Sequence, residues 1–285
     1  MKPDYITDEF LDRFISAAMA EDVGDGDHSS LASIPEETKS RAHLLVKDNG
    51  ILAGVALAEK IFHHVDNDLI VKILLTDGAG IKKGDIAFTV EGSAQSILTS
   101  ERLVLNCMQR MSAIATKTNY LTSLIAGTHT KLLDTRKTTP NFRLLEKWAV
   151  RIGGGKNHRI GLFDMIMLKD NHIDMAGGIE QAIFRTKDYL RATNRSLRIE
   201  IETRNLQEVK EVLKIGGIDI IMLDNMNLAD MKEAVKLIDG KFTTEASGGI
   251  TEATIKGVAE CGVDFISVGA LTHSVASLDL SLKAY

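Results

Sequence analysis

The chain has 285 residues, of which 44% are hydrophobic and 26% are charged, so it can bury a sizeable core and is not expected to be disordered. Its three prolines exclude a proline-rich chain, and the mild net charge of −5 argues against a nucleic-acid protein held by bulk charge. No apolar run approaches the ~20 residues of a membrane span, and the first residues lack the apolar core of a signal peptide. Cys107 and Cys261 have no CxxC spacing, which favours a reducing, cytoplasmic compartment over a disulfide scaffold.

The first part of the chain predicts helices and short strands in alternation. In chain order we expect a helix over residues 8–21, a β-like run over 42–46, a helical segment over 55–64 and a second β-like run over 69–75. A long helix then starts near Thr99 or Ser100, either of which can cap it, with Glu101 in its first turn. We place a domain boundary within this helix. It separates an N-terminal α/β domain, residues 1–112 with 274–285 joined to it, from a catalytic domain over 113–273.

The second part repeats a short pattern. Six apolar, β-branched runs cover residues 131–134, 165–168, 198–201, 218–223, 242–245 and 264–268. Helical patterns lie between several of them, as in 206–213 and 231–238. Strand and helix alternating at this spacing predict parallel βα units and, with six repeats, a βα barrel. An open doubly wound sheet is the competing fold, but no GxGxxG follows an early strand.

A charged residue or a glycine follows each of these runs. In chain order they are Arg136 with Lys137, Lys169, Glu200 with Glu202, Asp224, Glu245 with Ser247-Gly248-Gly249, and Gly269. Since the C-terminal ends of barrel strands meet at one mouth, where catalysis is built, we expect these side chains to converge there. The alternative is that polar residues simply begin ordinary loops.

The positive charge of the chain is local. Residues 131–172 carry nine Lys or Arg against four Asp or Glu, within a chain that is acidic as a whole. A mixture of Arg, Lys and His suits a small ligand with several carboxylates or phosphates, although a solvated basic face is the simpler alternative. The run 153–159 favours a ligand site because its three glycines bring bare backbone amides beside the charges.

Two acidic residues stand among these cations. Glu202 and Asp224 end successive runs, so their carboxylates should lie side by side and could hold Mg²⁺ or ribose hydroxyls. Ion pairing with the nearby lysines is the alternative. The glycines at 248, 249 and 269 follow late strands, where barrels commonly seat a phosphate on backbone amides.

At this point the motifs resemble those of the quinolinate phosphoribosyltransferase family. The matching segments are Glu101-Arg102, Thr135–Pro140, Gly153–Arg159, Lys169–His172, Glu200–Glu202, Leu223–Asn225, Ala246–Gly249 and Leu271–His273. The match runs in order through nearly the whole chain, and one departure is Ala113, where the family usually has Gly. The resemblance implies an open-faced α/β N-terminal domain beside an incomplete βα barrel. It also implies a homodimer with shared sites and the conversion of quinolinate and phosphoribosyl pyrophosphate to nicotinate mononucleotide, pyrophosphate and CO₂.

The resemblance also implies a role for each site residue. Quinolinate would be held by Arg136, His158, Arg159 and Lys169, with Arg102 reaching in from the other subunit. Phosphoribosyl pyrophosphate and Mg²⁺ would meet Lys137, Glu202 and Asp224, and phosphate would be held by Ser247, Gly248, Gly249, Gly269 and His273. Lys137, Lys169, Glu202 and Asp224 would be the catalytic residues.

Three other functions remain open from the sequence. A molybdenum-transport-associated relative of the same fold shares the Thr-Arg-Lys-Thr motif and would use another substrate. Lys169 at a strand end could instead form a Schiff base, as in barrel aldolases. A catalytically silent anion-binding module is the third.

Overall fold

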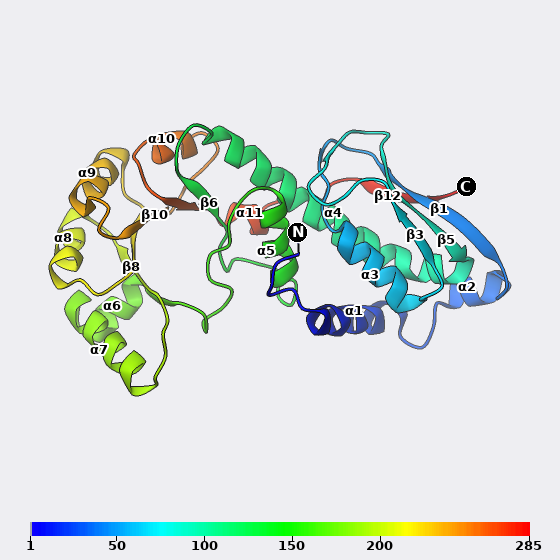
Figure 1. Cartoon of the computed structure of the whole chain (residues 1–285), viewed down its shortest axis with the longest axis horizontal. Helices are drawn as coiled ribbons and strands as arrows, with labels where there is room; N and C mark the ends of the chain where they lie inside the picture. The colour runs from blue at the N-terminus through cyan, green and yellow to red at the C-terminus, as the bar shows by residue number, and fades with distance from the viewer. Residues whose placement is uncertain (1) are drawn as a thin grey trace. The chain divides into compact units, whose positions relative to one another are not determined.

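The computed structural model describes residues 2–285, which fold as two compact units (Figure 1). Unit 1 contains the chain up to Asn119 together with Thr138–Gly154 and Ala270–Tyr285, and unit 2 contains Tyr120–Lys137 and Gly155–Gly269. The predicted boundary at 112/113 falls inside a helix that continues to Leu124. Among the described residues, no helix is both long and apolar enough to cross a membrane.

Unit 1 is built on a four-stranded antiparallel sheet with the order β12-β1-β5-β3. Its elements are α1 (Asp8–Val23), α2 (His28–Ser33), β1 (Lys39–Val46), β2 (Gly50–Ile51), α3 (Val55–Val65), β3 (Ile70–Ile73), β4 (Gly80–Ile81), β5 (Ile86–Ser93), α4 (Ala94–Leu124, of which the end from Tyr120 belongs to unit 2), α5 (Arg143–Ile152), α11 (Ala270–His273) and β12 (Leu280–Ala284). Alternate residues of β1 are buried, as expected for a strand with one covered face. Helix α3 packs on the sheet through Phe62, whose ring meets that of Phe88 edge to face at 5.7 Å.

The predicted start of the long helix was wrong by about five residues of sequence. Helix α4 begins at Ala94, directly after β5, and the hydroxyl of Ser93 accepts a hydrogen bond from the Ser96 N–H at 3.3 Å. Ser100, one of the two predicted caps, lies inside the helix and donates to the carbonyls of Ser96 and Ile97. A serine inside a helix can satisfy its hydroxyl in this way, so its presence did not mark an end.

Residues 138–154 fold into unit 1 although they lie between two strands of unit 2. The buried carboxylate of Glu146 accepts hydrogen bonds from Nε and Nη2 of Arg110 at 3.0 and 2.8 Å, and from the hydroxyl and N–H of Thr139. The same guanidinium donates to the carbonyl of Thr272. One arginine of α4 therefore joins α5 and the C-terminal segment to the N-terminal part of the chain.

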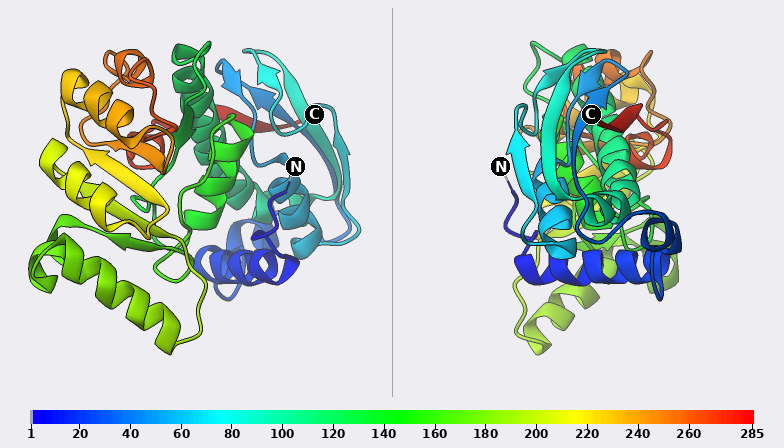
Figure 2. Two further views of the ribbon diagram at one scale, coloured as in Figure 1. Left: turned by 60° about the vertical axis from the view of Figure 1, so that its left-hand side comes forward. Right: turned by 90° about the vertical axis from the view of Figure 1, so that its right-hand side faces the viewer.

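Unit 2 contains a six-stranded parallel sheet with the order β6-β11-β10-β9-β8-β7. Its elements are β6 (Lys131–Leu133), β7 (Ile166–Leu168), α6 (Asp170–Ala176), α7 (Ile179–Ala192), β8 (Ile199–Thr203), α8 (Leu206–Ile215), β9 (Ile220–Asp224), α9 (Leu228–Ile238), β10 (Thr243–Ser247), α10 (Ile255–Ala259) and β11 (Phe265–Ser267). All six predicted runs are strands. Because β6 and β7 stand at opposite ends of the order, the sheet is an incomplete βα barrel, as the resemblance implied. Successive helices from α6 to α9 pack against one another along the sheet (Figure 2).

The segment 156–159 lies at the open side of this barrel. Lys156 bridges to β6 in parallel, donating its N–H to the carbonyl of Leu132 at 2.8 Å and accepting from the N–H of Asp134 at 3.2 Å. Three residues later, the Arg159 guanidinium donates to the carbonyl of Met165, just before β7, at 3.2 Å. The glycine-rich run 153–159 thus places Lys156 and Arg159 at the edges of the sheet.

Close packing of α5 on α4 predicts the effect of a single methyl group. A Cβ added at Gly153, the C-cap of α5, would lie 2.4 Å from the carbonyl oxygen of Ala115. We expect Gly153→Ala to lower the free energy of unfolding by about 3 kcal/mol, because backbone atoms must move. Gly80→Ala, where a Cβ meets open space, is the control and should change it by less than about 1 kcal/mol. Equal urea midpoints for the two variants would contradict this packing.

Candidate functional site

The register of the parallel sheet brings the predicted acidic residues to one face. Glu200 and Glu202 alternate with apolar residues along β8, so they share a face of the sheet. Glu202 pairs with Met222 of β9, Met222 pairs with Glu245 of β10, and Asp224 pairs with Ser247 at the strand ends. All three glutamates are buried, with exposures of 0 to 8%. The sheet therefore carries ionisable groups on the face that would otherwise be apolar core.

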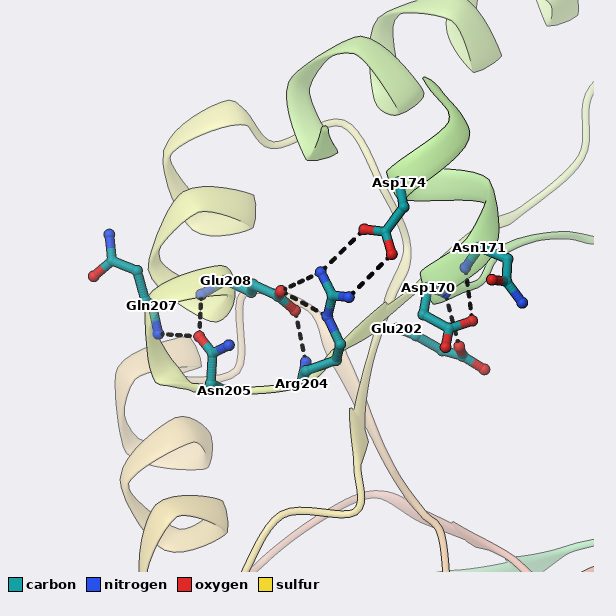
Figure 3. A network of polar contacts seen from close by, with 8 residues as sticks. All are labelled: Asp170, Asn171, Asp174, Glu202, Arg204, Asn205, Gln207 and Glu208. Carbon is teal, nitrogen blue, oxygen red and sulfur yellow. Dashed lines mark hydrogen bonds and ion pairs between the residues drawn. The ribbon is translucent and has the colours of Figure 1, made fainter. Parts of the chain in front are cut away.

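Glu202 is held by two donors at the beginning of α6. The ammonium of Lys169 lies 3.3 Å from its Oε1. The N–H of Asp170 donates to its Oε2 at 3.1 Å (Figure 3). Lys169 remains about half exposed, with 48% of its side chain accessible. Lys169 and Glu202, predicted from two different strand ends, thus form one ion pair, and the lysine head group is accessible to a ligand.

A second ion-pair network fixes the helix that holds Glu202 (Figure 3). The guanidinium of Arg204 donates to both carboxylate oxygens of Asp174 on α6 at 3.2 Å and, through Nε, to Glu208 on α8 at 2.8 Å. These partners, Glu208 first, raise the pKa of Arg204. Because the group is exposed, the network mainly sets the position of α6 relative to α8.

The guanidinium groups of Arg136 and Arg159 lie close enough to repel each other. Arg136 follows β6, and Arg159 ends the segment at the open side of the barrel. Burial, and then repulsion from Arg136, lower the pKa of Arg159, while Glu200 and Asp164 act in the opposite direction. Two like charges in a partly buried position are stabilised when an anion binds between them. This pair is therefore suited to a carboxylate.

The ends of β9 and β10 are joined through one asparagine. Asn225 donates its side-chain amide to Asp224 Oδ2 at 2.7 Å and its backbone N–H to the carbonyl of Ser247 at 2.9 Å. Gly248 has φ of +93°, and a Cβ there would lie 2.2 Å from Asn225 Oδ1. Glycine is required at this position both for its backbone conformation and for space. Asn225 thus links the predicted phosphate loop to the second predicted metal-binding carboxylate.

A buried cluster joins the predicted ligand His158 to Glu200 and Glu245, two acids at strand ends for which the sequence predicted no role. The ring of His158 has its Nε2 2.9 Å from Glu200 Oε2 and 3.5 Å from Glu245 Oε2. Asp134, also buried, accepts from the N–H of His158 at 2.9 Å and from the amide of Asn157 at 2.6 Å. The alternation that places Glu200 on the same face as Glu202 was the available signal.

Burial governs the protonation of this cluster. It raises the pKa of Glu245 to about 8, and the neighbouring charges of Glu200 and Asp134 act in the same direction. His158 and a hydrogen bond from Ser267 act in the opposite direction without cancelling the effect of burial. A carboxylic acid that keeps its proton near neutral pH is the result.

The remaining predicted residues are distributed over both units. Lys137 is exposed beside Arg136, and its backbone N–H donates to Thr135 at 3.0 Å. Gly249, with φ of +60°, and Gly269 follow strands of unit 2. Arg102 is exposed on α4, and His273 is exposed on α11 with its Nδ1 2.5 Å from the Ser274 hydroxyl. These last two residues belong to unit 1, whereas the others belong to unit 2.

Two family models match nearly the whole chain. Residues 27–112 match the N-terminal domain of quinolinate phosphoribosyl transferase, and residues 114–283 match its C-terminal domain.

Individual relatives agree with these models. The chain is 48% identical to a chloroplastic nicotinate-nucleotide pyrophosphorylase (carboxylating) of Arabidopsis thaliana, over 96% of this chain and 82% of that protein. It is 40% identical to a probable enzyme of the same name from Synechocystis, over 96% and 92%. Among solved structures, the nicotinate-nucleotide pyrophosphorylase of Francisella tularensis superposes with a TM-score of 0.90 at 39% identity, covering 98% of each chain. NadC of Streptococcus pyogenes gives 0.92 at 38% identity, covering 98% of this chain and 97% of that one.

The retained proton of Glu245 predicts how stability varies with pH. An unfolded chain loses this proton near the ordinary pKa of 4.5, whereas the folded protein keeps it to about pH 8. Between these values the folded state binds more protons, so this residue makes stability fall as pH rises. We expect Glu245→Gln to gain stability relative to the parent between pH 5 and pH 8, measured by urea unfolding.

Glu233→Gln, at an exposed position on α9, is the matched control and should follow the parent. A difference between Glu245→Gln and the parent that stays constant over this pH range would contradict the buried proton.

Proposed function

The chain belongs to the quinolinate phosphoribosyltransferase family, and we propose that it transfers the phosphoribosyl group of phosphoribosyl pyrophosphate to quinolinate. The products are nicotinate mononucleotide, pyrophosphate and CO₂, so the enzyme is a pentosyltransferase of NAD biosynthesis. The observation that carries this proposal is that two strand-end carboxylates, Glu202 and Asp224, share one face of the sheet in unit 2, where Glu202 is paired with Lys169.

Quinolinate is a dianion, and the cations of the open side suit it. We assign its carboxylates to Arg136, Arg159 and Lys169, with His158 beside them. The two guanidiniums present planar pairs of donors for a carboxylate, and Lys169 adds a point charge. Binding an anion between Arg136 and Arg159 also relieves the repulsion that these two groups exert on each other.

Phosphoribosyl pyrophosphate is assigned to the carboxylates and the late-strand loops. Lys137 would meet its pyrophosphate, and Ser247, Gly248, Gly249, Gly269 and His273 would hold phosphate. The hard oxygen ligands of Glu202 and Asp224 suit Mg²⁺, which when bound offsets negative charge on the leaving pyrophosphate. Both Glu202 oxygens already have donors, which favours binding through water over direct coordination.

The protein has to orient the two substrates and stabilise the charges that develop between them. It does not have to supply a base or a nucleophile. As the bond from ribose C1 to pyrophosphate breaks, positive charge develops on the ribose, where the carboxylates of Glu202 and Asp224 can stabilise it. Lys137 stabilises the departing pyrophosphate, and the quinolinate nitrogen forms the new bond to C1. The resulting cationic ring accepts the electron pair left when the 2-carboxylate departs as CO₂, and a solvent proton then takes that position. Holding the two anions in contact is the main contribution of the protein.

Lys169 is better placed as a cation than as a Schiff-base nucleophile. Its ammonium forms an ion pair with the carboxylate of Glu202 at 3.3 Å, and a Schiff-base mechanism has no use for this paired acid or for a phosphate loop. This contact supports the transferase over the aldolase alternative.

The assembly and compartment belong to the same proposal. We place the enzyme in the cytoplasm as a homodimer in which Arg102 of one subunit completes the site of the other. Its exposed position on α4 leaves Arg102 accessible to a second subunit. Cys107 and Cys261 are both buried and unpaired with each other, which fits a reducing compartment.

The activity can be tested directly with purified protein. Quinolinate, phosphoribosyl pyrophosphate and Mg²⁺ should give nicotinate mononucleotide, and removal of Mg²⁺ by EDTA should stop the reaction. Arg159→Lys should raise the KM for quinolinate by about tenfold while leaving the KM for phosphoribosyl pyrophosphate nearly unchanged, because the planar donor pair is lost. Product formation with nicotinate but not with quinolinate would assign the chain to another substrate.

Subunit mixing tests the shared site. Arg102→Ala and Lys137→Ala should each be inactive alone, since each defect affects every site of a homodimer. After the two proteins are mixed and their subunits exchange, heterodimers contain one intact site, and about a quarter of the parent activity should return. If mixed proteins that have exchanged subunits stay inactive, Arg102 does not act across a dimer.

A further inference from the structure

Both backbone polar groups of Lys169 are bonded to helix α6. Its N–H donates to Nδ1 of the His172 ring at 3.0 Å, and its carbonyl accepts from the N–H of Ile173 at 3.0 Å. Lys169 is therefore the N-cap of this helix, and the place of its ammonium depends on where α6 lies. Because Lys169 is assigned to a carboxylate of quinolinate, whatever holds α6 also determines where that carboxylate can bind.

Apolar packing holds α6 only weakly. Of the seven residues described for this helix, Ile173 alone is buried, and Met175 is 86% exposed. The helix is followed by Gly177 and Gly178, with φ of +93° and +121°. A helix this short is not stable by its own hydrogen bonds, so contacts with its neighbours set its position. Its polar contacts therefore matter more than they would on a longer and better-packed helix.

The end of β8 contacts α6 at two points one helical turn apart (Figure 3). Glu202 Oε2 accepts from the N–H of Asp170 at 3.1 Å, and both Nη atoms of Arg204 donate to the carboxylate of Asp174 at 3.2 Å. A planar guanidinium that meets both oxygens of a carboxylate fixes direction as well as distance. The second contact thus prevents α6 from pivoting about the first.

Arg204 is itself held by the beginning of α8 (Figure 3). The side chain of Asn205 caps this helix, accepting from the N–H of Glu208 at 3.0 Å. Glu208, whose side chain is only 14% exposed, accepts from Nε of Arg204 at 2.8 Å and from its backbone N–H at 2.7 Å. Because Glu208 fixes Nε and the backbone, the guanidinium is already oriented toward Asp174 when the two meet. Such a contact is suited to positioning, although an exposed ion pair contributes little to stability.

We propose that Arg204 is a positioning residue for quinolinate binding: through Asp174 it holds α6 in the orientation in which Lys169 presents its ammonium to a substrate carboxylate. Glu202 depends less on this contact, because β8 is paired with both β7 and β9. Arg204 acts through α6 and not on the substrate. This inference rests on the proposed function, because it takes Lys169 as a quinolinate ligand.

A pair of substitutions tests the contact between Arg204 and Asp174. Arg204→Met removes the donors and keeps the length of the side chain, and Asp174→Ala removes the acceptor. Each should raise the KM for quinolinate by about fivefold and change the KM for phosphoribosyl pyrophosphate by less than about twofold, since Lys169 is displaced while Glu202 stays in its strand. The double variant should raise the KM for quinolinate no further than either single one, because both substitutions break the same contact.

Arg191→Met is the matched control. Arg191 forms an exposed ion pair with Asp188 within α7, and its loss should leave both KM values unchanged. Urea midpoints of all these variants should stay near that of the parent, which separates an effect on position from an effect on folding. Amide hydrogen exchange of residues 170–176 without substrate should become faster in Arg204→Met and stay as in the parent in Arg191→Met.

Four results contradict the proposal: an unchanged KM for quinolinate in Arg204→Met, equal increases in both KM values, multiplying effects in the double variant, or parent-like exchange of α6 in Arg204→Met. If the parent forms no nicotinate mononucleotide, the proposed function fails and this inference fails with it. If the parent is active and any of these four results is obtained, this inference fails alone.

Discussion

Charge buried on one face of a parallel sheet is the constraint on which the site depends. A parallel barrel normally fills this face with apolar side chains, yet here Glu200, Glu202 and Glu245 occupy it. Each carboxylate must meet a donor or keep a proton, because an uncompensated buried charge is strongly unfavourable. Lys169 and the α6 backbone compensate Glu202, while His158 and a retained proton serve the other two. The acids thereby determine where the neighbouring cations lie.

This arrangement explains how a chain with an acidic total can present a cationic opening. The glutamates are buried on one face of the sheet. The charges of Glu200 and Glu202 act on Arg159 in the direction opposite to the repulsion from Arg136. The cations therefore remain close enough to bind two anionic substrates in contact with each other. Function and stability are linked here, since the same buried acids support the binding residues and carry the desolvation penalty.

The strands of unit 2 and several residues at their ends were predictable from the sequence, because they depend on local patterns of residues. Short β-branched runs fixed the six strands, and the residues after them identified Lys169 and Asp224. The start of α4 was mispredicted, since Ser100 satisfies its hydroxyl within the helix and resembles a cap only in sequence. Glu200 and Glu245 were visible as residues at strand ends, but their common contact with His158 was not, because the three residues are brought together only by the fold.

The sequence by itself determined the alternation of strands and helices, the local cationic charge and the motif residues, since each depends on neighbours a few positions away. Only the tertiary structure decided which acid meets which cation, that residues 138–154 join unit 1 through Arg110 and Glu146, and which acids surround the His158 ring. These outcomes depend on groups far apart in the chain, whose desolvation and hydrogen bonding are set only when the sheet closes around them.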